Sequence, residues 1–242
     1  MTFLAILPCA VLFIIIWRAG KIEKEPPALL IKLLIGGALT VISAMILGLI
    51  GTAILEVLVV QGSMLYLLID NFIVTALVEE GGKYFVLKKL TWRSPAFDHT
   101  FDAVVYAVTA SLGFAVVENI LYLADATLGL AFMRGILSVP GHVIDGVFMG
   151  YFYGIAKQCE HRGEYGGMKR NLKLALIVPM LLHGFYDFCL CTEDETFLVI
   201  FFIFEIIITV AAIIKVRKLS KQDAPIIQKD EITYERDDKL IK

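Results

Sequence analysis

The chain alternates long apolar stretches with short clusters of charged residues, and this alternation limits its fold more than any other feature. A helix needs about 20 predominantly apolar residues to cross the roughly 30 Å of hydrocarbon in a bilayer. Hydrophobic residues make up 58% of the chain and its mean hydropathy is +0.78, far above the values of soluble domains. The sequence therefore predicts an all-α protein, a polytopic transmembrane helical bundle.

Seven apolar stretches can be delimited, each ended by charged residues or by turn-forming residues. They cover residues 2–17, 30–55, 66–87, 101–123, 130–156, 174–190 and 197–214. We expect one membrane domain over residues 1–216 and a charged, pliable tail over residues 217–242. The basic segment 157–173 is expected to be a loop. No basic residue precedes the first stretch, so we interpret it as a retained span rather than a signal peptide.

The distribution of lysine and arginine predicts the orientation. Positive charges gather in alternate connections, at residues 18–24, 88–93, 157–173 and 215–218, whereas the connections near Gln61, Asp125 and Glu193 have none. The positive-inside rule then places the amino terminus outside and the carboxyl terminus in the cytoplasm. Residues 29–69 are long enough for two short helices, but two would place Lys88 and Lys89 outside. We therefore expect one helix there, followed by an outer connection.

The third stretch carries Glu79-Glu80-Gly-Gly-Lys83 within an apolar run. A charged side chain at bilayer depth costs about 2.5–3.5 kcal/mol on insertion scales, so three together need a reason. On a helix, Lys83 can pair with either glutamate, because the spacings are four and three residues. One carboxylate is then left over, and in a site of low dielectric such a group is suited to proton transfer. The alternative is an ion pair that only joins helices.

Ionisable side chains recur in the next three stretches. The fourth carries Glu118, the fifth carries His142 and Asp145, and the sixth carries His183 and Asp187. Ionisable residues within membrane spans usually face the bundle interior and mark a functional site. Any one of these histidines alone would more often be a hydrogen-bonded core residue, but four successive stretches with such groups predict a common site.

These residue types suit metal-assisted hydrolysis. A catalytic zinc ion takes three protein ligands and leaves one position for water, and Glu118, His142 and His183 are the candidate ligands for zinc or another divalent metal. Glu79 or Glu80 is the candidate general base. A route without metal, in which a glutamate and a histidine activate water, uses the same residues, and the spacing does not separate the two.

Other polar residues are candidates for supporting roles. Asp187 lies one helical turn after His183 and is placed to orient its imidazole. Asp145 and Asn119 are expected to support their neighbouring ligands in the same way. Lys83 is expected to keep one glutamate ionised or to stabilise a developing oxyanion.

The chain lacks the sequence motifs of other protease classes and of phosphate-binding proteins. The chain has no GxSxG, HExxH or GxGD motif and no Walker-type phosphate loop. Its net charge of −2 gives no basic field of the kind that nucleic-acid-binding proteins show. Gly146, Gly150 and Gly154 form two overlapping GxxxG steps, which predict a close helix contact beside His142.

The ordered polar motifs resemble one family. They are Glu79-Glu80-x-x-Lys83, Phe114-x-x-x-Glu118-Asn119, His142 and His183-x-x-x-Asp187. This series, over about residues 72–187, resembles the PrsW family of intramembrane proteases, which is related to the CAAX-protease and bacteriocin-processing group. That broader group has Phe-x-x-x-His and Glu-Glu-x-x-x-Arg where this chain has Glu118 and Lys83, which favours the PrsW branch over prenyl-protein processing.

The resemblance implies a multi-pass protease of the bacterial plasma membrane. It implies that Glu79, Glu80, His142 and His183 are catalytic, together with Glu118. It also implies the substrate, a single-span membrane anti-sigma factor whose first, extracytoplasmic cut activates a stress-response sigma factor. Two alternatives remain open: a proton-coupled membrane carrier, although no inverted repeat is visible, and a non-catalytic membrane scaffold or immunity protein.

Overall fold

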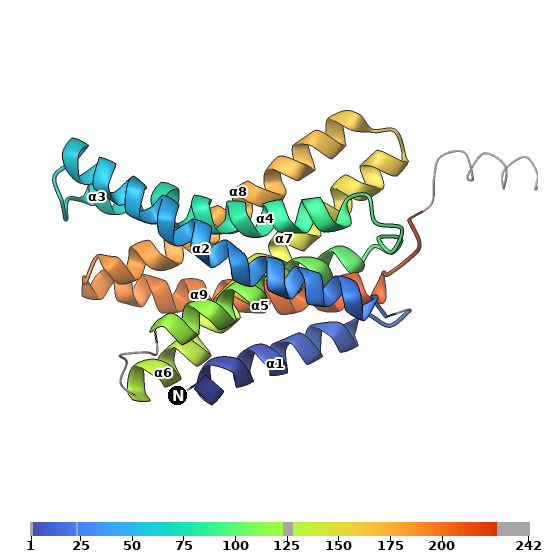
Figure 1. Cartoon of the computed structure of the whole chain (residues 1–242), viewed down its shortest axis with the longest axis horizontal. Coiled ribbons are helices and arrows are strands. Elements are labelled where there is room, and N and C mark those ends of the chain that lie inside the picture. Colours follow the sequence, from blue (N-terminus) through green and yellow to red (C-terminus); the bar gives the residue numbers. More distant parts are fainter. Residues whose placement is uncertain (1, 23, 123–127, 227–242) are drawn as a thin grey trace, which may run out of the picture.

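The computed structural model describes residues 2–22, 24–122 and 128–226, and within them the regular structure is helical apart from one isolated bridge (Figure 1). The all-α prediction is confirmed. The elements are α1 (Thr2–Ala19), α2 (Pro27–Leu58), α3 (Met64–Ile69), the π-helical segment η1 (Asp70–Ala76), α4 (Leu77–Thr91), α5 (Asp102–Tyr122), α6 (Leu128–Ile136), α7 (Ser138–His161), α8 (Tyr165–Cys191) and α9 (Glu195–Lys221).

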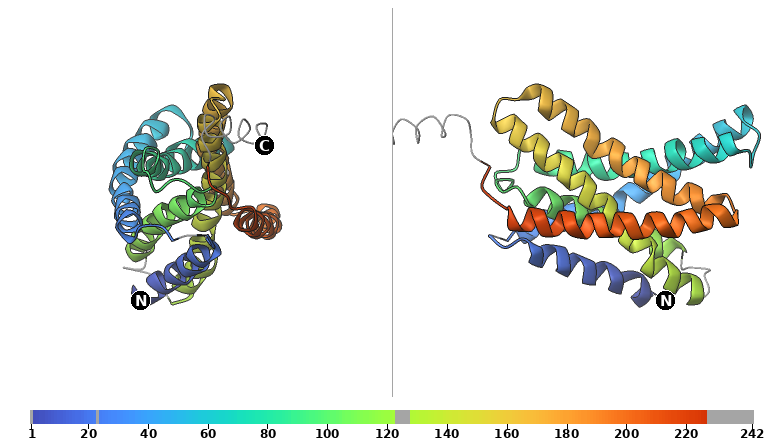
Figure 2. Two further views of the ribbon diagram at one scale, coloured as in Figure 1. Left: turned by 90° about the vertical axis from the view of Figure 1, so that its right-hand side faces the viewer. Right: turned by 180° about the vertical axis from the view of Figure 1, so that it is seen from behind.

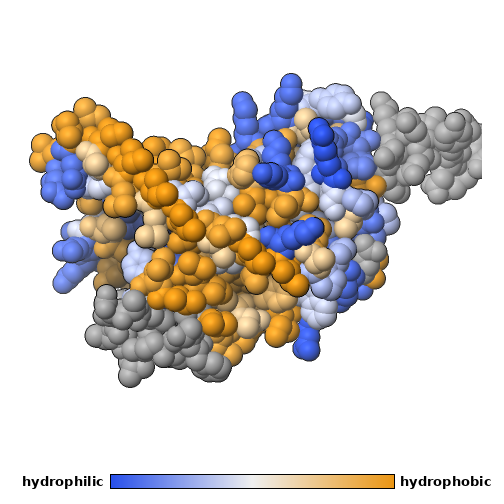
Figure 3. Space-filling model, viewed as in Figure 1, coloured by the Kyte–Doolittle hydropathy of each residue, from blue (hydrophilic) through white to orange (hydrophobic). Residues whose placement is uncertain are grey.

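Four of the described helices, α2, α5, α8 and α9, are long and apolar enough to cross a membrane. In the most apolar window of α5, 72% of the residues are buried, against 17% in α2 and 22% in α9, so α5 is the central helix and the other two face outward. Figure 3 shows apolar side chains along α2, while hydrophilic ones gather at the right-hand end. The other expected spans correspond to α1, the run α3–η1–α4 and α7, and a total of seven spans stays a prediction.

Glycines bring α2 and α5 into backbone contact. A Cβ atom on Gly37 would lie 2.0 Å from the carbonyl oxygen of Ala110, and one on Gly113 would lie 2.1 Å from that of Leu34. No larger residue fits at either position unless the helices separate. This crossing anchors the amino-terminal half of α2 on the central helix.

The glycine series of α7 confirms the predicted close contact. A Cβ atom on Gly146 would lie 2.9 Å from the Cα atom of Val108, and one on Gly150 would lie 2.6 Å from that of Val104. Helix α7 therefore lies directly on α5. His142 is one turn before Gly146, so this contact fixes its distance from α5.

The connections between helices divide between the two ends of the molecule, as Figures 1 and 2 show. The α2–α3 and α8–α9 connections, which contain Gln61 and Glu193, lie at one end. The α1–α2, α4–α5 and α7–α8 connections and the end of α9 lie at the other. This division agrees with the alternation of basic residues, while Asp125 lies outside the described residues. Which end faces the cytoplasm stays a prediction.

Two expectations about loops are corrected. The segment 157–173 is mostly helical, because α7 continues to His161 and α8 begins at Tyr165. The turn between them is short, and Gly163 adopts a φ of 71°, which glycine tolerates best. The expected span 130–156 is broken at Leu137 into α6 and α7. Charged residues are good helix formers, so a helix does not have to end where its apolar stretch ends.

The first part of the expected tail, residues 217–226, contacts the bundle. Helix α9 continues to Lys221, and the segment after it returns to the α4–α5 connection. There the backbone N–H of Ile226 donates to the carbonyl of Asp98 at 2.6 Å, and Asp223 accepts from the Thr100 hydroxyl at 3.1 Å and from the N–H of Phe101 at 3.0 Å. Residues 217–226 are therefore tied to the bundle, and residues 227–242 lie outside the described part.

Candidate active site

Helix α4 contributes the paired charges. Of the two glutamates that Lys83 can reach, it bonds directly to Glu80: its Nζ donates to Glu80 Oε1 at 2.6 Å and lies 3.8 Å from Glu79 Oε2. The side chains of Glu80 and Lys83 are completely buried, whereas that of Glu79 is 14% exposed. The π-helical segment η1 immediately precedes α4, and such segments are frequent at functional sites.

Helix α7 places His142 between two charged groups from other helices. Its Nδ1 lies 3.1 Å from Lys83 Nζ, and its Nε2 lies 2.8 Å from Glu118 Oε2. An ammonium group only donates hydrogen bonds and a carboxylate only accepts them. Nδ1 is therefore the acceptor, and Nε2 carries the proton that it donates to Glu118. The arrangement assigns one neutral tautomer to His142.

Helix α8 places His183 between two carboxylates. Its Nδ1 lies 2.8 Å from Glu80 Oε1, and its Nε2 lies 3.2 Å from Asp187 Oδ2, as expected for a group that orients the imidazole. Asp145 differs from the expectation. Its Oδ2 lies 3.9 Å from His183 Nδ1, so it faces His183 rather than supporting His142.

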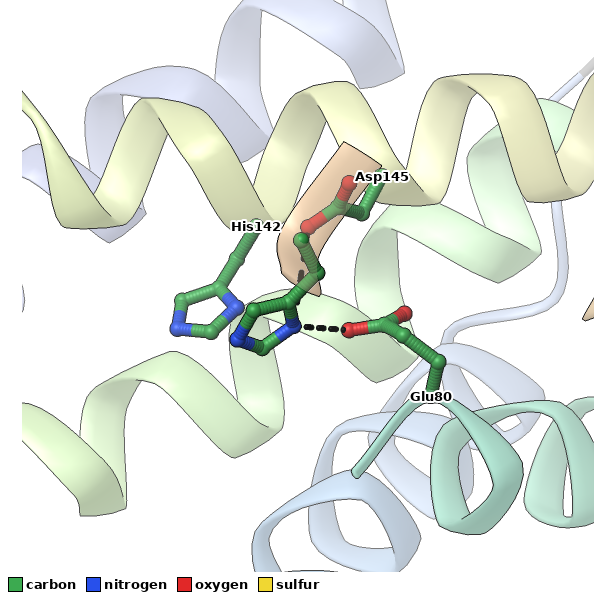
Figure 4. Close-up of side chains that lie close together, drawn as sticks. Glu80, His142 and Asp145 are labelled. Atoms are coloured by element: carbon green, nitrogen blue, oxygen red, sulfur yellow. Dashed lines mark hydrogen bonds and ion pairs between the residues drawn. The ribbon is translucent and has the colours of Figure 1, made fainter. Parts of the chain in front are cut away.

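The helices bring four donor groups to one point. One donor atom each from Glu80, His142, Asp145 and His183 lies within 4.8 Å of the others, and all four residues are buried. Figure 4 shows Glu80, His142 and Asp145 converging from α4 and α7. Of the metal ligands expected from the sequence, His142 and His183 belong to this cluster. Glu118 does not, because it occupies the opposite nitrogen of His142.

One cavity reaches this donor cluster, and a smaller one lies beside it. The larger, about 470 Å³, extends from Asp145, His183 and Asp187 to Asp70 and Cys191, near the α2–α3 and α8–α9 connections. The smaller, about 350 Å³, lies between α2, η1 and α5. Glu79, Thr75, Glu118 and Tyr122 line both cavities. Glu80 lines neither of them, so of the two adjacent glutamates on α4 only Glu79 is accessible from both.

A comparison with known families gives a clear match to this arrangement. A family model described as "PrsW family intramembrane metalloprotease" matches residues 25–214, which includes every residue of the site. The chain belongs to the PrsW family. It is therefore an intramembrane protease, and the resemblance noted from its motifs is confirmed.

Curated PrsW proteases from several bacteria are similar over much of their length. "Protease PrsW" of Oceanobacillus iheyensis is 35% identical over 187 residues, which are 76% of this chain and 80% of the relative. The protein of the same name from Halalkalibacterium halodurans is 30% identical over 220 residues, covering 90% of this chain and 96% of the relative. No solved structure matches the chain.

The donor cluster suits the metal that the PrsW family description implies. Two imidazoles and two carboxylates are donor types that zinc accepts. Glu79 Oε2 and Glu80 Oε2 are buried without a hydrogen-bond partner among the described groups, which is costly unless another species satisfies them. The Lys83 ammonium would oppose a metal here, because even two unit charges about 4 Å apart repel by about 4 kcal/mol at an effective dielectric of 20.

Sequence reasoning missed Arg134. The expected span 130–156 contains it, but the structure places it on α6 against the end of α5. Its guanidinium lies 3.1 Å from Glu118 Oε2, donates to Asn119 Oδ1 at 3.0 Å and stacks 3.8 Å from the centre of the Tyr122 ring. Asn119 therefore supports Arg134 rather than a histidine. A lone arginine within an apolar stretch was the available signal.

Glu205 of α9 was also missed. It is buried, it lines the larger cavity, and its Oε1 has no hydrogen-bond partner among the described groups. The signal was a single carboxylate within the apolar stretch 197–214. Its position adds a further acidic group to the part of the cavity wall that α9 supplies.

Proposed function

We propose that this PrsW-family protease makes the first, extracytoplasmic cut in a single-span membrane anti-sigma factor and so activates a stress-response sigma factor. The observation that supports the chemistry best is the convergence of Glu80, His142, Asp145 and His183 beside Glu79, which faces two cavities. The substrate class rests on the family resemblance of the motifs.

We infer different roles for the two glutamates. Glu79 lines both cavities and has a carboxylate oxygen without a hydrogen-bond partner among the described groups. It is therefore the better candidate for the general base, because a base must reach the water whose proton it takes. Glu80 is completely buried and bonded to Lys83 and His183, which suits a ligand or positioning role.

The proposed metal site takes its ligands from among Glu80, His142, Asp145 and His183, with zinc or another divalent ion as the occupant and one position left for water. Such an ion, when bound, acidifies water and polarises a carbonyl group. Glu118 holds the imidazole of His142 in place from its far side, and Asp187 does the same for His183. Outer contacts of this kind fix the ring orientation and raise ligand basicity. The metal-free route uses Glu79 and His183 in the same positions.

The proposed location is the bacterial plasma membrane, with the amino terminus outside. In this orientation the larger cavity opens toward the outer end of the bundle, because it is lined by Asp70, Asn71 and Cys191 near the α2–α3 and α8–α9 connections. Water would then reach Glu79 from outside. The cut is therefore expected at the outer edge of the partner's membrane segment, which releases its extracytoplasmic domain.

Purified protein in liposomes, mixed with a single-span anti-sigma factor, tests the proposal. Cleavage by the wild type, its loss in Glu79→Gln and His183→Ala, and a product end at the outer edge of the partner's span would support it. A product end on the cytoplasmic side would contradict the access route. Proton-coupled uptake of a solute without any cleavage would favour the carrier.

A further inference from the structure

The smaller cavity forms a groove on the side of the bundle, here called the lateral groove. Its walls come from α2, η1 and α5, and include Val41, Met45, Gly48, Val74, Phe114 and Leu121. Glu79 and Glu118 also line it, and both belong to the larger cavity of the candidate active site. The lateral groove is therefore mostly apolar, and it adjoins the larger cavity of the site at these two glutamates.

The groove exists because α2 and α5 diverge. They are in backbone contact where Gly37 meets Ala110 and where Gly113 meets Leu34, and farther along they separate, as Figure 1 shows. Gly51 of α2 contacts η1 instead, because a Cβ atom there would lie 2.8 Å from the Val74 side chain. Between these contacts, a Cβ atom on Gly48 would have no neighbour within 4 Å. The open space lies at Gly48.

The outer side of the groove faces the region that lipid occupies. Met45 is 53% exposed, and the adjoining residues Ile46 and Leu49 are 54% and 72% exposed. Apolar side chains this exposed on a membrane helix are in contact with hydrocarbon. A molecule that enters the groove therefore comes from within the bilayer and presents apolar surface.

We propose that the lateral groove receives the membrane segment of the protein substrate, with its peptide backbone next to Glu79. This inference rests on the proposed proteolytic function and adds the route by which the substrate arrives. Backbone N–H groups freed when a helix unwinds cannot be left unpaired in hydrocarbon. The carboxylates of Glu79 and Glu118 are acceptors for such groups, whereas a lipid acyl chain offers them no donor. These carboxylates favour a peptide over a lipid as the occupant.

A matched pair of cross-linkers tests the occupant. A photoreactive amino acid is placed at Met45, which lines the groove, or at Ile46, which is equally exposed but does not. Both positions carry Glu79→Gln to prevent cleavage. We expect cross-links from position 45 to the membrane segment of a single-span partner, and at least about tenfold fewer from position 46. Cross-links from position 45 to lipid alone would overturn the proposal.

A blocking variant tests the route in the active enzyme. Gly48→Trp fills the open space, and Ile46→Trp is the control on the lipid-facing side of the same helix. In liposomes, Gly48→Trp should slow cleavage of the membrane-anchored partner by about tenfold or more while bound metal stays at the wild-type level. Cleavage equal to that of Ile46→Trp would contradict the inference. Failure of the wild type to cleave any partner would instead count against the proposed function.

Discussion

Lys83 Nζ lies 3.1 Å from His142 Nδ1 and 2.6 Å from Glu80 Oε1, so an ammonium group sits among atoms that are candidate metal ligands. A bound divalent ion and this ammonium would repel each other, so the ammonium in this position weakens metal binding. We therefore expect Lys83 to influence metal binding as well as to neutralise buried carboxylates.

Replacing this charge should therefore strengthen metal binding. Lys83→Met is expected to bind zinc about 100-fold more tightly than the wild type or more, since a repulsion of a few kcal/mol is removed, while its cleavage activity falls. Titration of metal-free protein by calorimetry measures the change. Lys88→Met, at an exposed position of the same helix, is the control. Weaker zinc binding in Lys83→Met would show that the lysine supports the metal site instead.

Changing Glu79 or Glu80 to glutamine should have different effects on metal content. Glu79→Gln is expected to lose cleavage but to keep its metal, because an amide cannot accept the proton of water. Glu80→Gln is expected to lose both, as is His183→Ala, because ligands are removed. Cleavage assays paired with metal analysis of the purified variants test this. Full activity in both glutamine variants would refute a catalytic role for the pair.

Arg134 should affect the rate of cleavage indirectly, because it contacts Glu118, which in turn holds His142. Arg134→Gln is expected to reduce metal affinity or activity about 10–100-fold, the usual effect of losing an outer contact to a ligand. Arg134→Lys should recover part of the loss, because it keeps the charge beside Glu118. The control is Arg162→Gln in the α7–α8 turn. Equal activity in Arg134→Gln and Arg162→Gln would show that Arg134 does not contribute to the site.

The contact between α7 and α5 should be sensitive to a single methyl group. Gly150→Ala places a Cβ atom 2.6 Å from the Cα atom of Val104, so the helices must separate, and we expect a loss of about 1–3 kcal/mol of stability. Gly166→Ala is the control, because nothing lies within 4 Å of a Cβ atom there. Unfolding in mild detergent compares them. No difference would contradict the close contact.

Cysteine labelling tests the orientation. In a variant with the exposed Cys191 replaced by serine, an impermeant reagent should label cysteines at Gln61 and Glu193 from outside intact cells, because the basic connections are expected in the cytoplasm. A cysteine at Arg162 should react only after the cells are opened. Labelling of position 162 in intact cells would reverse the model of orientation.

The sequence determined the features that follow from helix periodicity and composition. The apolar stretches predicted an all-α membrane protein, and residues three or four apart on one helix had to meet, as Lys83 does with Glu80 and His183 with Asp187. The glycine series likewise predicted that α7 has a face suited to close packing, though not that α5 is its partner. These features depend on local geometry, which the order of residues fixes directly.

The tertiary structure decided which groups from different helices meet. Gly146 and Gly150 allow backbone contact with α5 and so fix the rotation of α7 about its axis. In this rotation His142 faces both Lys83 and Glu118. Asp145, on the same helix, faces His183. The break at Leu137 brings Arg134 to Glu118. The spacing of residues within one helix cannot predict these contacts, because they depend on how neighbouring helices rotate and cross. The sequence by itself therefore predicted the chemical groups of the site, while packing between helices decided how those groups are paired.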